Sequence, residues 1–217
     1  MIEVLEGTSK KKILVLAPHT DDGEFGCGGT IAKLLEGGAE VYYVAFSSCD
    51  ESLPADLPKD TLIKELFDAT KSLGIPDSNV RVLNYPVRKF TSFRQDILED
   101  MVQLNIEISP DVVFLPSTYD THQDHNTISN EGFRAFKKRT MLGYELPWNN
   151  MSFNTGCFVL LNESHVNSKI SAIHWYKSQE GRPYFKANTI RALAITRGTQ
   201  IGAEFSEAFE VVRLVIE

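Results

Sequence analysis

Hydrophobic positions along the chain predict strands that alternate with helices. The apolar run over residues 13–17 is continuous, as in a strand buried on both faces of a parallel sheet. Over residues 24–36 apolar residues recur at helical spacing, and Gly37 and Gly38 provide a stop signal. A second β-rich run covers residues 40–46. A helix between two such strands favours a right-handed crossover between parallel strands.

The alternation continues to the end of the chain. Further helices are expected over residues 59–73, 91–108, 127–138, 166–177 and 187–196, and further strands over residues 80–85, 112–116, 155–161 and 209–216. The repeated pattern predicts an α/β fold with a Rossmann-like, doubly wound, mostly parallel sheet flanked by helices. The length suits one sizeable core, so residues 1–217 are expected to form a single domain.

Composition and charge narrow the class of protein. Hydrophobic residues make up 42% of the chain and charged residues 24%, which excludes disordered, collagen-like and coiled-coil sequences. The 22 Lys and Arg residues against 29 Asp and Glu residues give a net charge of -7. This charge repels phosphate backbones, so no nucleic-acid partner is expected.

The cysteines and the N-terminal pattern predict the cellular location. Cys27, Cys49 and Cys157 form no C-x-x-C pair and are odd in number, which favours a reducing compartment over a disulfide framework. The first apolar run is too short for a signal peptide or a membrane span. We therefore expect a cytoplasmic protein without a membrane span. The oligomeric state stays open, with a homo-oligomer as one alternative.

Imidazole and carboxylate groups follow two of the predicted strands. The first cluster, after residues 13–17, contains His19, Asp21 and Asp22, and the second, after residues 112–116, contains His122, Asp124 and His125. The carboxyl ends of parallel strands share one edge of a sheet, so the clusters can meet although they are about a hundred residues apart. Taken singly, each has a plain alternative: an acidic turn with Asp22 as helix N-cap, and a solvated polar loop.

One residue set in these clusters suits a catalytic metal. Zinc takes histidine nitrogen and carboxylate oxygen, and a catalytic site keeps one position open for water. His19, Asp22 and His125 supply such a set. Two histidines and one carboxylate also describe a non-haem Fe(II) oxygenase, so this alternative stays open, as does a catalytically inactive α/β ligand-binding module.

The other three polar residues of the clusters suit acid/base chemistry. Asp21 is a spare carboxylate beside the ligands and fits a general base. His122 can donate a hydrogen bond or a proton to a developing oxyanion, while Asp124 could fix the orientation of His122 and stabilise its charged form. An oxygenase would leave these residues without a role, and its usual all-β scaffold conflicts with the alternating pattern.

The two clusters together resemble the motifs of one enzyme family. His19-Thr20-Asp21-Asp22, the following Gly26-Cys27-Gly28-Gly29-Thr30, and His122-Gln123-Asp124-His125 look like the PIG-L/LmbE-like zinc-dependent N-deacetylases. The family's motifs usually read (A/P)-H-P-D-D and H-P-D-H, so Thr20 and Gln123 stand where proline is usual. Weaker similarity extends over most of the chain, for example at Ser178 and Gln179.

The resemblance implies a fold, a reaction and a role for each residue. The fold would be LmbE-like, and the substrate a small N-acetylated amino sugar or conjugate of the N-acetylglucosamine type. The family's metal, Zn²⁺ with Fe²⁺ or Co²⁺ as alternatives, would be held by His19, Asp22 and His125. The family's acid/base would be Asp21, and its tetrahedral intermediate would be stabilised by His122 and Asp124.

Three further residues are candidates for contacts with the substrate. Arg88 and Arg94 follow a predicted strand that ends at the same edge of the sheet, so they could bind a sugar hydroxyl, phosphate or carboxylate. Tyr144 falls in a predicted loop over residues 143–154 that could wall a sugar site by stacking. The alternatives are a solvated charged face for the arginines and local packing for the tyrosine.

Overall fold

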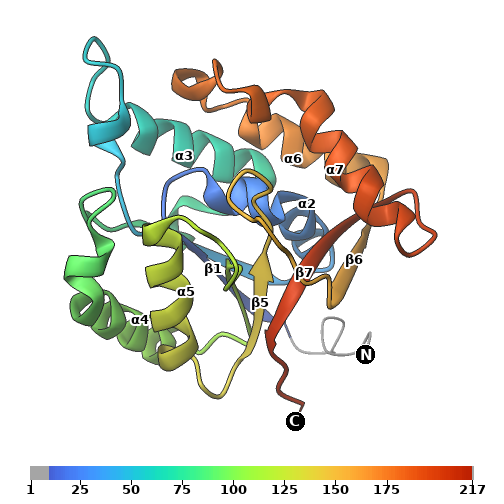
Figure 1. Cartoon of the computed structure of the whole chain (residues 1–217), viewed down its shortest axis with the longest axis horizontal. Coiled ribbons are helices and arrows are strands. Elements are labelled where there is room, and N and C mark those ends of the chain that lie inside the picture. Colours follow the sequence, from blue (N-terminus) through green and yellow to red (C-terminus); the bar gives the residue numbers. More distant parts are fainter. Residues whose placement is uncertain (1–9, 217) are drawn as a thin grey trace.

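A seven-stranded sheet forms the centre of the protein in the computed structural model, which describes residues 10–216 (Figure 1). The strand order is β3-β2-β1-β4-β5-β7-β6. The strands are β1 (Lys12–Ala17), β2 (Glu40–Ala45), β3 (Val80–Val82), β4 (Val112–Pro116), β5 (Thr140–Tyr144), β6 (Cys157–Leu161) and β7 (Phe205–Arg213). β1 to β5 are parallel, and β7 runs antiparallel to both β5 and β6.

Helices cover both faces of this sheet. The helices are α2 (Asp22–Glu36), α3 (Thr61–Leu73), α4 (Arg94–Ile108), α5 (Gln123–Ala135), α6 (Glu163–Ile173) and α7 (Ala187–Thr199). α2, α3, α6 and α7 lie over one face, and α4 and α5 lie over the other (Figure 1). Within residues 10–216, no helix is long and apolar enough to cross a membrane. Residues 1–9 and 217 of the predicted single domain lie outside the described part.

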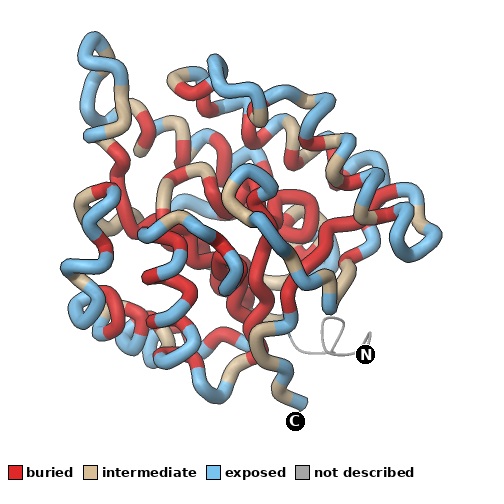
Figure 2. The backbone as a smooth tube through the Cα atoms, viewed as in Figure 1, coloured by how far each residue is buried: buried red, intermediate tan, exposed pale blue. Residues whose placement is uncertain are grey.

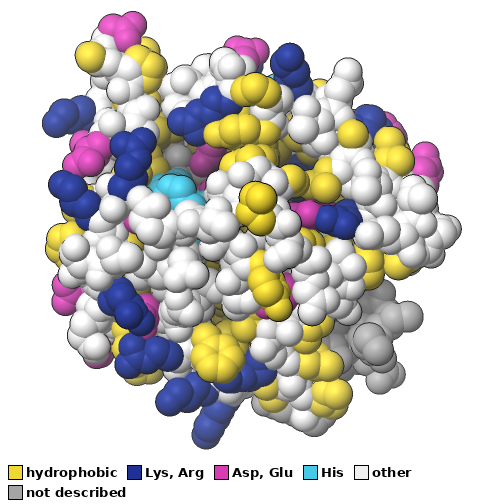
Figure 3. Space-filling view, in the orientation of Figure 1, with side chains coloured by type: hydrophobic (Ala, Val, Ile, Leu, Met, Phe, Trp, Pro, Cys, Tyr) yellow, Lys and Arg dark blue, Asp and Glu magenta, His cyan; other side chains and the backbone are white. Residues whose placement is uncertain are grey.

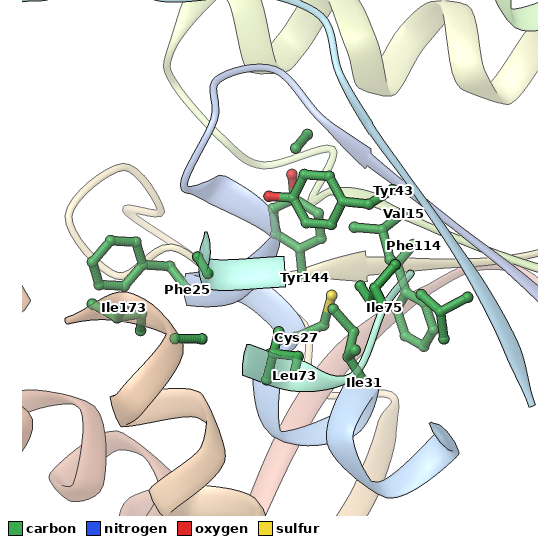
Figure 4. Packing of buried hydrophobic residues seen from close by; sticks show 14 of the residues in the cluster. Val15, Phe25, Cys27, Ile31, Tyr43, Leu73, Ile75, Phe114, Tyr144 and Ile173 are labelled. Atoms are coloured by element: carbon green, nitrogen blue, oxygen red, sulfur yellow. The ribbon is translucent and has the colours of Figure 1, made fainter. Parts of the chain in front are cut away.

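The continuous apolar run of β1 is explained by its central position. Ile13 and Val15 pack into the core under α2 and α3, whereas Leu14 and Leu16 pack into the second core under α4 and α5. All four side chains are fully buried, and the central strands β1, β4 and β5 are buried over almost their whole length (Figure 2). Figure 4 shows the first of these cores, where Val15 and Phe114 from the sheet meet residues of α2. The predicted doubly wound, mostly parallel α/β sheet is confirmed.

The chain winds outward in both directions from β1 and β4. It passes from β1 to β2 and β3, crosses back to β4, and continues to β5 on the other side. The neighbours β1 and β4 therefore form the switch point of the topology, where ligands bind in open α/β sheets.

Several predicted boundaries are wrong. β5 was missed, because Thr140–Tyr144 is short, contains Gly143 and follows three basic residues. A side chain at Gly143 would lie 3.0 Å from the Cα atom of Ser117, so this strand needs a glycine to approach the loop after β4. α5 begins at Gln123, four residues before the predicted start, and β7 begins at Phe205, also four residues early.

Candidate active site

The two polar clusters lie side by side at the carboxyl edge of the sheet. β1 and β4 are neighbouring parallel strands, so the loops that follow them share this edge. α2 begins at Asp22 after the first loop, and α5 begins at Gln123 after the second. The amino ends of both helices therefore border the site, where their dipoles favour negative charge. Figure 3 shows a histidine surface in a hollow between other side chains.

Three acceptor atoms converge between these loops. Nδ1 of His19 lies 3.1 Å from Oδ2 of Asp22 and 3.1 Å from Nε2 of His125. Oδ2 of Asp22 is 3.2 Å from that same Nε2 of His125. The outer ring nitrogens face carboxylates: His19 Nε2 lies 3.1 Å from Asp124, and His125 Nδ1 lies 2.8 Å from Asp120. An ionised carboxylate only accepts, so in the neutral rings the outer nitrogens carry the proton and the inner nitrogens present lone pairs.

The electrostatic potential at this point favours positive charge. Burial lowers the pKa of His125, but Asp22 and Asp120 outweigh burial and raise it to about 10. The pKa of His19 is also raised, because Asp22 and Asp124 outweigh its burial. Burial opposes ionisation of Asp22, yet His125 and His19 hold its pKa well below the ordinary value. The converging atoms can therefore be stabilised by an added proton or by a cation.

Asp21 stands beside this cluster with its carboxylate available. It is the N-cap of α2, but its side chain makes no capping hydrogen bond, and the expected alternative of Asp22 as N-cap is wrong. Burial and the charge of Asp22 raise the pKa of Asp21 to about 6, while His19 and Arg182 act in the opposite direction. A carboxyl with such a pKa can accept and release a proton near neutral pH.

The orientation of His122 comes from the backbone of Asp124. Nδ1 of His122 accepts a hydrogen bond from the Asp124 backbone N–H at 3.2 Å, so the ring proton lies on Nε2. Burial, together with the charges of His125 and His19, lowers the pKa of His122 to about 4 and keeps the ring neutral. The predicted contact between the Asp124 carboxylate and this ring is wrong. That carboxylate accepts instead from His19 Nε2 and from the backbone N–H groups of Arg88 and Phe90.

The cluster forms the base of an open cavity of about 200 Å³. The wall includes Arg88 as predicted, and Trp148 of the predicted loop over residues 143–154 also lines it. It adds Gln179, Arg182 and Tyr184, which the sequence did not indicate as cavity residues. The rings of Trp148 and Tyr184 stack at 4.0 Å. The match at Ser178-Gln179 was the one sequence signal that pointed to this segment.

Two of the residues proposed for substrate contact lie elsewhere. Tyr144 belongs to β5 rather than a loop, is fully buried, and donates its hydroxyl to the backbone oxygen of Leu16 at 3.0 Å. Arg94 begins α4, and its Nε donates to Glu131 at 2.7 Å. Neither residue lines the cavity. Asp120 is a residue that sequence reasoning missed, although it stands only two positions before His122.

A buried hydrogen-bond network holds the turn that carries the first cluster. Glu24 is fully buried, and its carboxyl lies 2.5 Å from the hydroxyl of Tyr43 and 3.0 Å from that of Tyr176. Both hydroxyls also lie within 2.9 Å of the backbone oxygen of Thr20. Burial raises the pKa of Glu24 to about 8, so it adds a proton to this network at neutral pH. The network joins the turn to β2 and to the segment after α6.

The last strand supports both cluster-bearing loops. α2 is kinked at Cys27, whose φ of -146° and ψ of 22° are not helical. Glu207 of β7 accepts the N–H groups of Gly29 at 3.1 Å and Thr30 at 2.7 Å just beyond the kink. Glu210 of the same strand accepts the backbone N–H of Thr118, in the loop after β4, at 2.8 Å. Two carboxylates of β7 thus fasten α2 and the loop after β4 to the sheet.

The sequence of this chain matches a known protein family over the stretch that contains the site. Residues 14–136 match the family described as "PIG-L: GlcNAc-PI de-N-acetylase", and this stretch contains both clusters. The chain belongs to the PIG-L family. The resemblance inferred from the two motifs is confirmed, and the protein is a member of a deacetylase family.

Relatives of this PIG-L protein extend the match beyond the family stretch. It is 26% identical to "Uncharacterized deacetylase YaiS" of Escherichia coli over 81% of this chain and 96% of that protein. It is 27% identical to "Probable N-acetyl-alpha-D-glucosaminyl L-malate deacetylase 2" of Bacillus cereus over 59% of this chain and 62% of that protein. The solved N,N'-diacetylchitobiose deacetylase of Pyrococcus horikoshii has the same fold, with a TM-score of 0.77, 24% identity, and coverage of 96% of this chain and 88% of that chain.

Proposed function

We propose that this protein is a metal-dependent hydrolase that removes the N-acetyl group of an amino sugar or its conjugate, of the N-acetylglucosamine type. The observation that carries the proposal is the convergence of His19 Nδ1, Asp22 Oδ2 and His125 Nε2 at 3.1–3.2 Å at the base of a cavity. Asp21 and His122 border the same cavity. The family and the names of the relatives support the substrate class.

The three converging atoms fit a catalytic zinc ion. Bonds of about 2.0–2.2 Å at tetrahedral angles would place neighbouring donor atoms about 3.3–3.6 Å apart. The observed separations of 3.1–3.2 Å lie just below this range. The same nitrogen and carboxylate donors also suit Fe²⁺ and Co²⁺. Asp120 and Asp124 fix the tautomers of the two histidines, as the outer partners of metal-ligating histidines do.

A set of three histidines is the competing ligand group. His19, His122 and His125 offer nitrogen atoms that all lie within 4.8 Å of one another. We favour Asp22 over His122 because its Oδ2 lies 3.1 Å from His19 Nδ1 and 3.2 Å from His125 Nε2, and because it adds a negative charge. His122 then keeps its Nε2–H for the substrate.

The proposed reaction divides the chemistry among the chain's own residues. A divalent ion at this site supplies Lewis acidity, which lowers the pKa of water towards neutrality and polarises a carbonyl group. Asp21 takes a proton from water as the water oxygen adds to the acetyl carbon. The Nε2–H of His122 donates a hydrogen bond to the oxyanion that develops on the carbonyl oxygen. Asp21 then delivers its proton to the nitrogen as the C–N bond breaks, which yields acetate and a free amine.

Metal analysis and acetate release test the proposal together. Purified protein should hold one divalent ion, release acetate from N-acetylglucosamine derivatives, and lose this activity when a chelator removes the ion. Oxygen consumption that requires Fe(II), without acetate release, would instead favour the oxygenase. Protein that binds N-acetylated sugars without metal or turnover would favour an inactive ligand-binding module. The cytoplasmic location, the absence of a nucleic-acid partner and the oligomeric state stay predictions from the sequence.

A further inference from the structure

Two arginines border the cavity from different parts of the fold. Arg88 lies in the turn after β3, and Arg182 lies between the short helices Lys177–Gln179 and Pro183–Phe185. Both residues are exposed and both line the cavity. In Figure 3, Lys and Arg side chains lie on two sides of the hollow in which the histidine surface is visible. The mouth of the site is therefore bordered by positive charge.

These two guanidinium groups are left without a carboxylate. Among residues 10–216, neither is within ion-pair distance of an Asp or Glu side chain, and Arg182 donates to the hydroxyl of Tyr184 at 2.9 Å. The arginines that do pair with carboxylates are Arg81, Arg94, Arg134, Arg191 and Arg197.

The backbone of Arg88 is held beside the site by a hydrogen bond to Asp124. Its φ of 65° lies in the left-handed region, which residues other than glycine rarely adopt. Its N–H donates to Oδ2 of Asp124 at 2.5 Å, and the same carboxylate contacts Nε2 of His19. The neighbours Val87 and Phe90 are buried. The turn is thus fixed at a defined place relative to the catalytic cluster, and non-glycine residues in this conformation concentrate at functional sites.

We propose that the substrate carries an anionic group, a carboxylate or a phosphate, beside its acetamide, and that Arg88 and Arg182 bind this group. This proposal rests on the proposed function, because the anionic group is a further part of the same substrate whose acetamide is cleaved in this cavity. Guanidinium groups match carboxylate and phosphate oxygens with paired hydrogen bonds. Near Asp21 and Asp22, and with a net charge of -7, an anion would otherwise be repelled.

Three N-acetylglucosamine derivatives test this assignment: the neutral propyl glycoside, the glycoside of glycolic acid and the 1-phosphate. Arg88→Gln and Arg182→Gln should each lower kcat/KM about 10- to 100-fold on the charged derivative that the enzyme prefers, the usual scale for a hydrogen bond to a charged group. On the propyl glycoside the change should stay within about threefold. Lys89→Gln, next to Arg88, and Lys186→Gln, four residues after Arg182, remove exposed charges outside the cavity wall and should change neither value. The preferred charged derivative distinguishes carboxylate from phosphate.

Binding of the products provides a measurement that does not depend on turnover. Calorimetry with glucosamine 1-phosphate, the glycolic acid glucosaminide and the propyl glucosaminide should show weaker binding of the preferred anion alone in both arginine variants. Equal losses on neutral and charged compounds, or no loss in variants with native circular dichroism, would overturn the anion site and leave the deacetylase intact. Anion binding that depends on both arginines, without acetate release from any derivative, would retain the anion site as a binding site and reject the deacetylase.

Discussion

Replacing Asp120 by asparagine tests how far the hydrogen-bond partner of the proposed metal ligand His125 contributes to metal binding while His125 itself stays in place. Asp120 is buried, and its two oxygens accept from His125 Nδ1 at 2.8 Å and from the backbone N–H of His122 at 2.8 Å. Asparagine has the same shape, and its oxygen can still accept from His122. Its NH₂ group would then face the Nδ1–H of His125, donor against donor. The ring must therefore move its proton to Nε2, the atom that faces His19 and Asp22.

The expected effect is a loss of metal affinity at constant fold. The outer partner of a metal-ligating histidine contributes about 10- to 100-fold in affinity, which is about 1.4–2.7 kcal/mol. Competition between the protein and a chelating dye measures this affinity, and circular dichroism with thermal unfolding in excess chelator reports the fold of the metal-free protein. The same change at the exposed Asp68 of α3 is the control. Unaltered affinity in natively folded Asp120→Asn would refute the tautomer argument and with it the assignment of His125 Nε2 as a ligand atom.

Three further substitutions test the chemistry and the packing. Asp21→Asn should retain the metal but lower turnover about 10²- to 10⁴-fold, and loss of metal in Asp21→Asn would contradict the role of Asp21 as a base. Because a base with a pKa of about 6 must be ionised to act, kcat/KM of the wild-type protein should fall below about pH 6. His122→Ala should lower kcat about 10²- to 10³-fold with the metal retained, whereas an effect on KM alone would speak against oxyanion stabilisation. Gly26→Ala would place a Cβ 2.3 Å from the Tyr144 ring and should destabilise the fold by about 1–3 kcal/mol in urea unfolding. Gly37→Ala has 3.4 Å to its nearest neighbour and should be close to neutral, so equal effects would contradict the packing argument.

The centre of the fold could be predicted because burial leaves a direct mark on the sequence. β1 and β4 are covered on both faces, so their residues are continuously apolar, and the polar clusters that follow them stand out. Since parallel neighbours share an edge, the meeting of His19 with His125 followed from topology alone. The periphery left weaker marks: β5 has five residues and a glycine, which resemble a turn, and so Tyr144 was placed in a loop.

The arrangement around the ligands could not be predicted, because it depends on which way each side chain turns. Asp124 was assigned to the nearby His122, but its carboxylate contacts His19, which lies in the loop after β1. Asp120 belonged to neither motif, and its role rests on the contact between its Oδ2 and His125 Nδ1, which depends on how the loop before α5 is folded. Arg182 and Tyr184 reach the cavity from the segment before α7, where no hydrophobic period indicates the path of the chain.

The position of β7 has a consequence for the order in which the protein can be assembled during synthesis. In the sheet this last strand lies between β5 and β6, and within residues 10–216 β6 has no other strand as a neighbour. β6 must therefore wait until β7 has been synthesised before it can join the sheet. Glu207 and Glu210, which fasten α2 and the loop after β4, arrive with that same strand. A nascent chain that already contains residues 14–136 thus still lacks the supports of its active site, which become available only once residues 205–213 have been made.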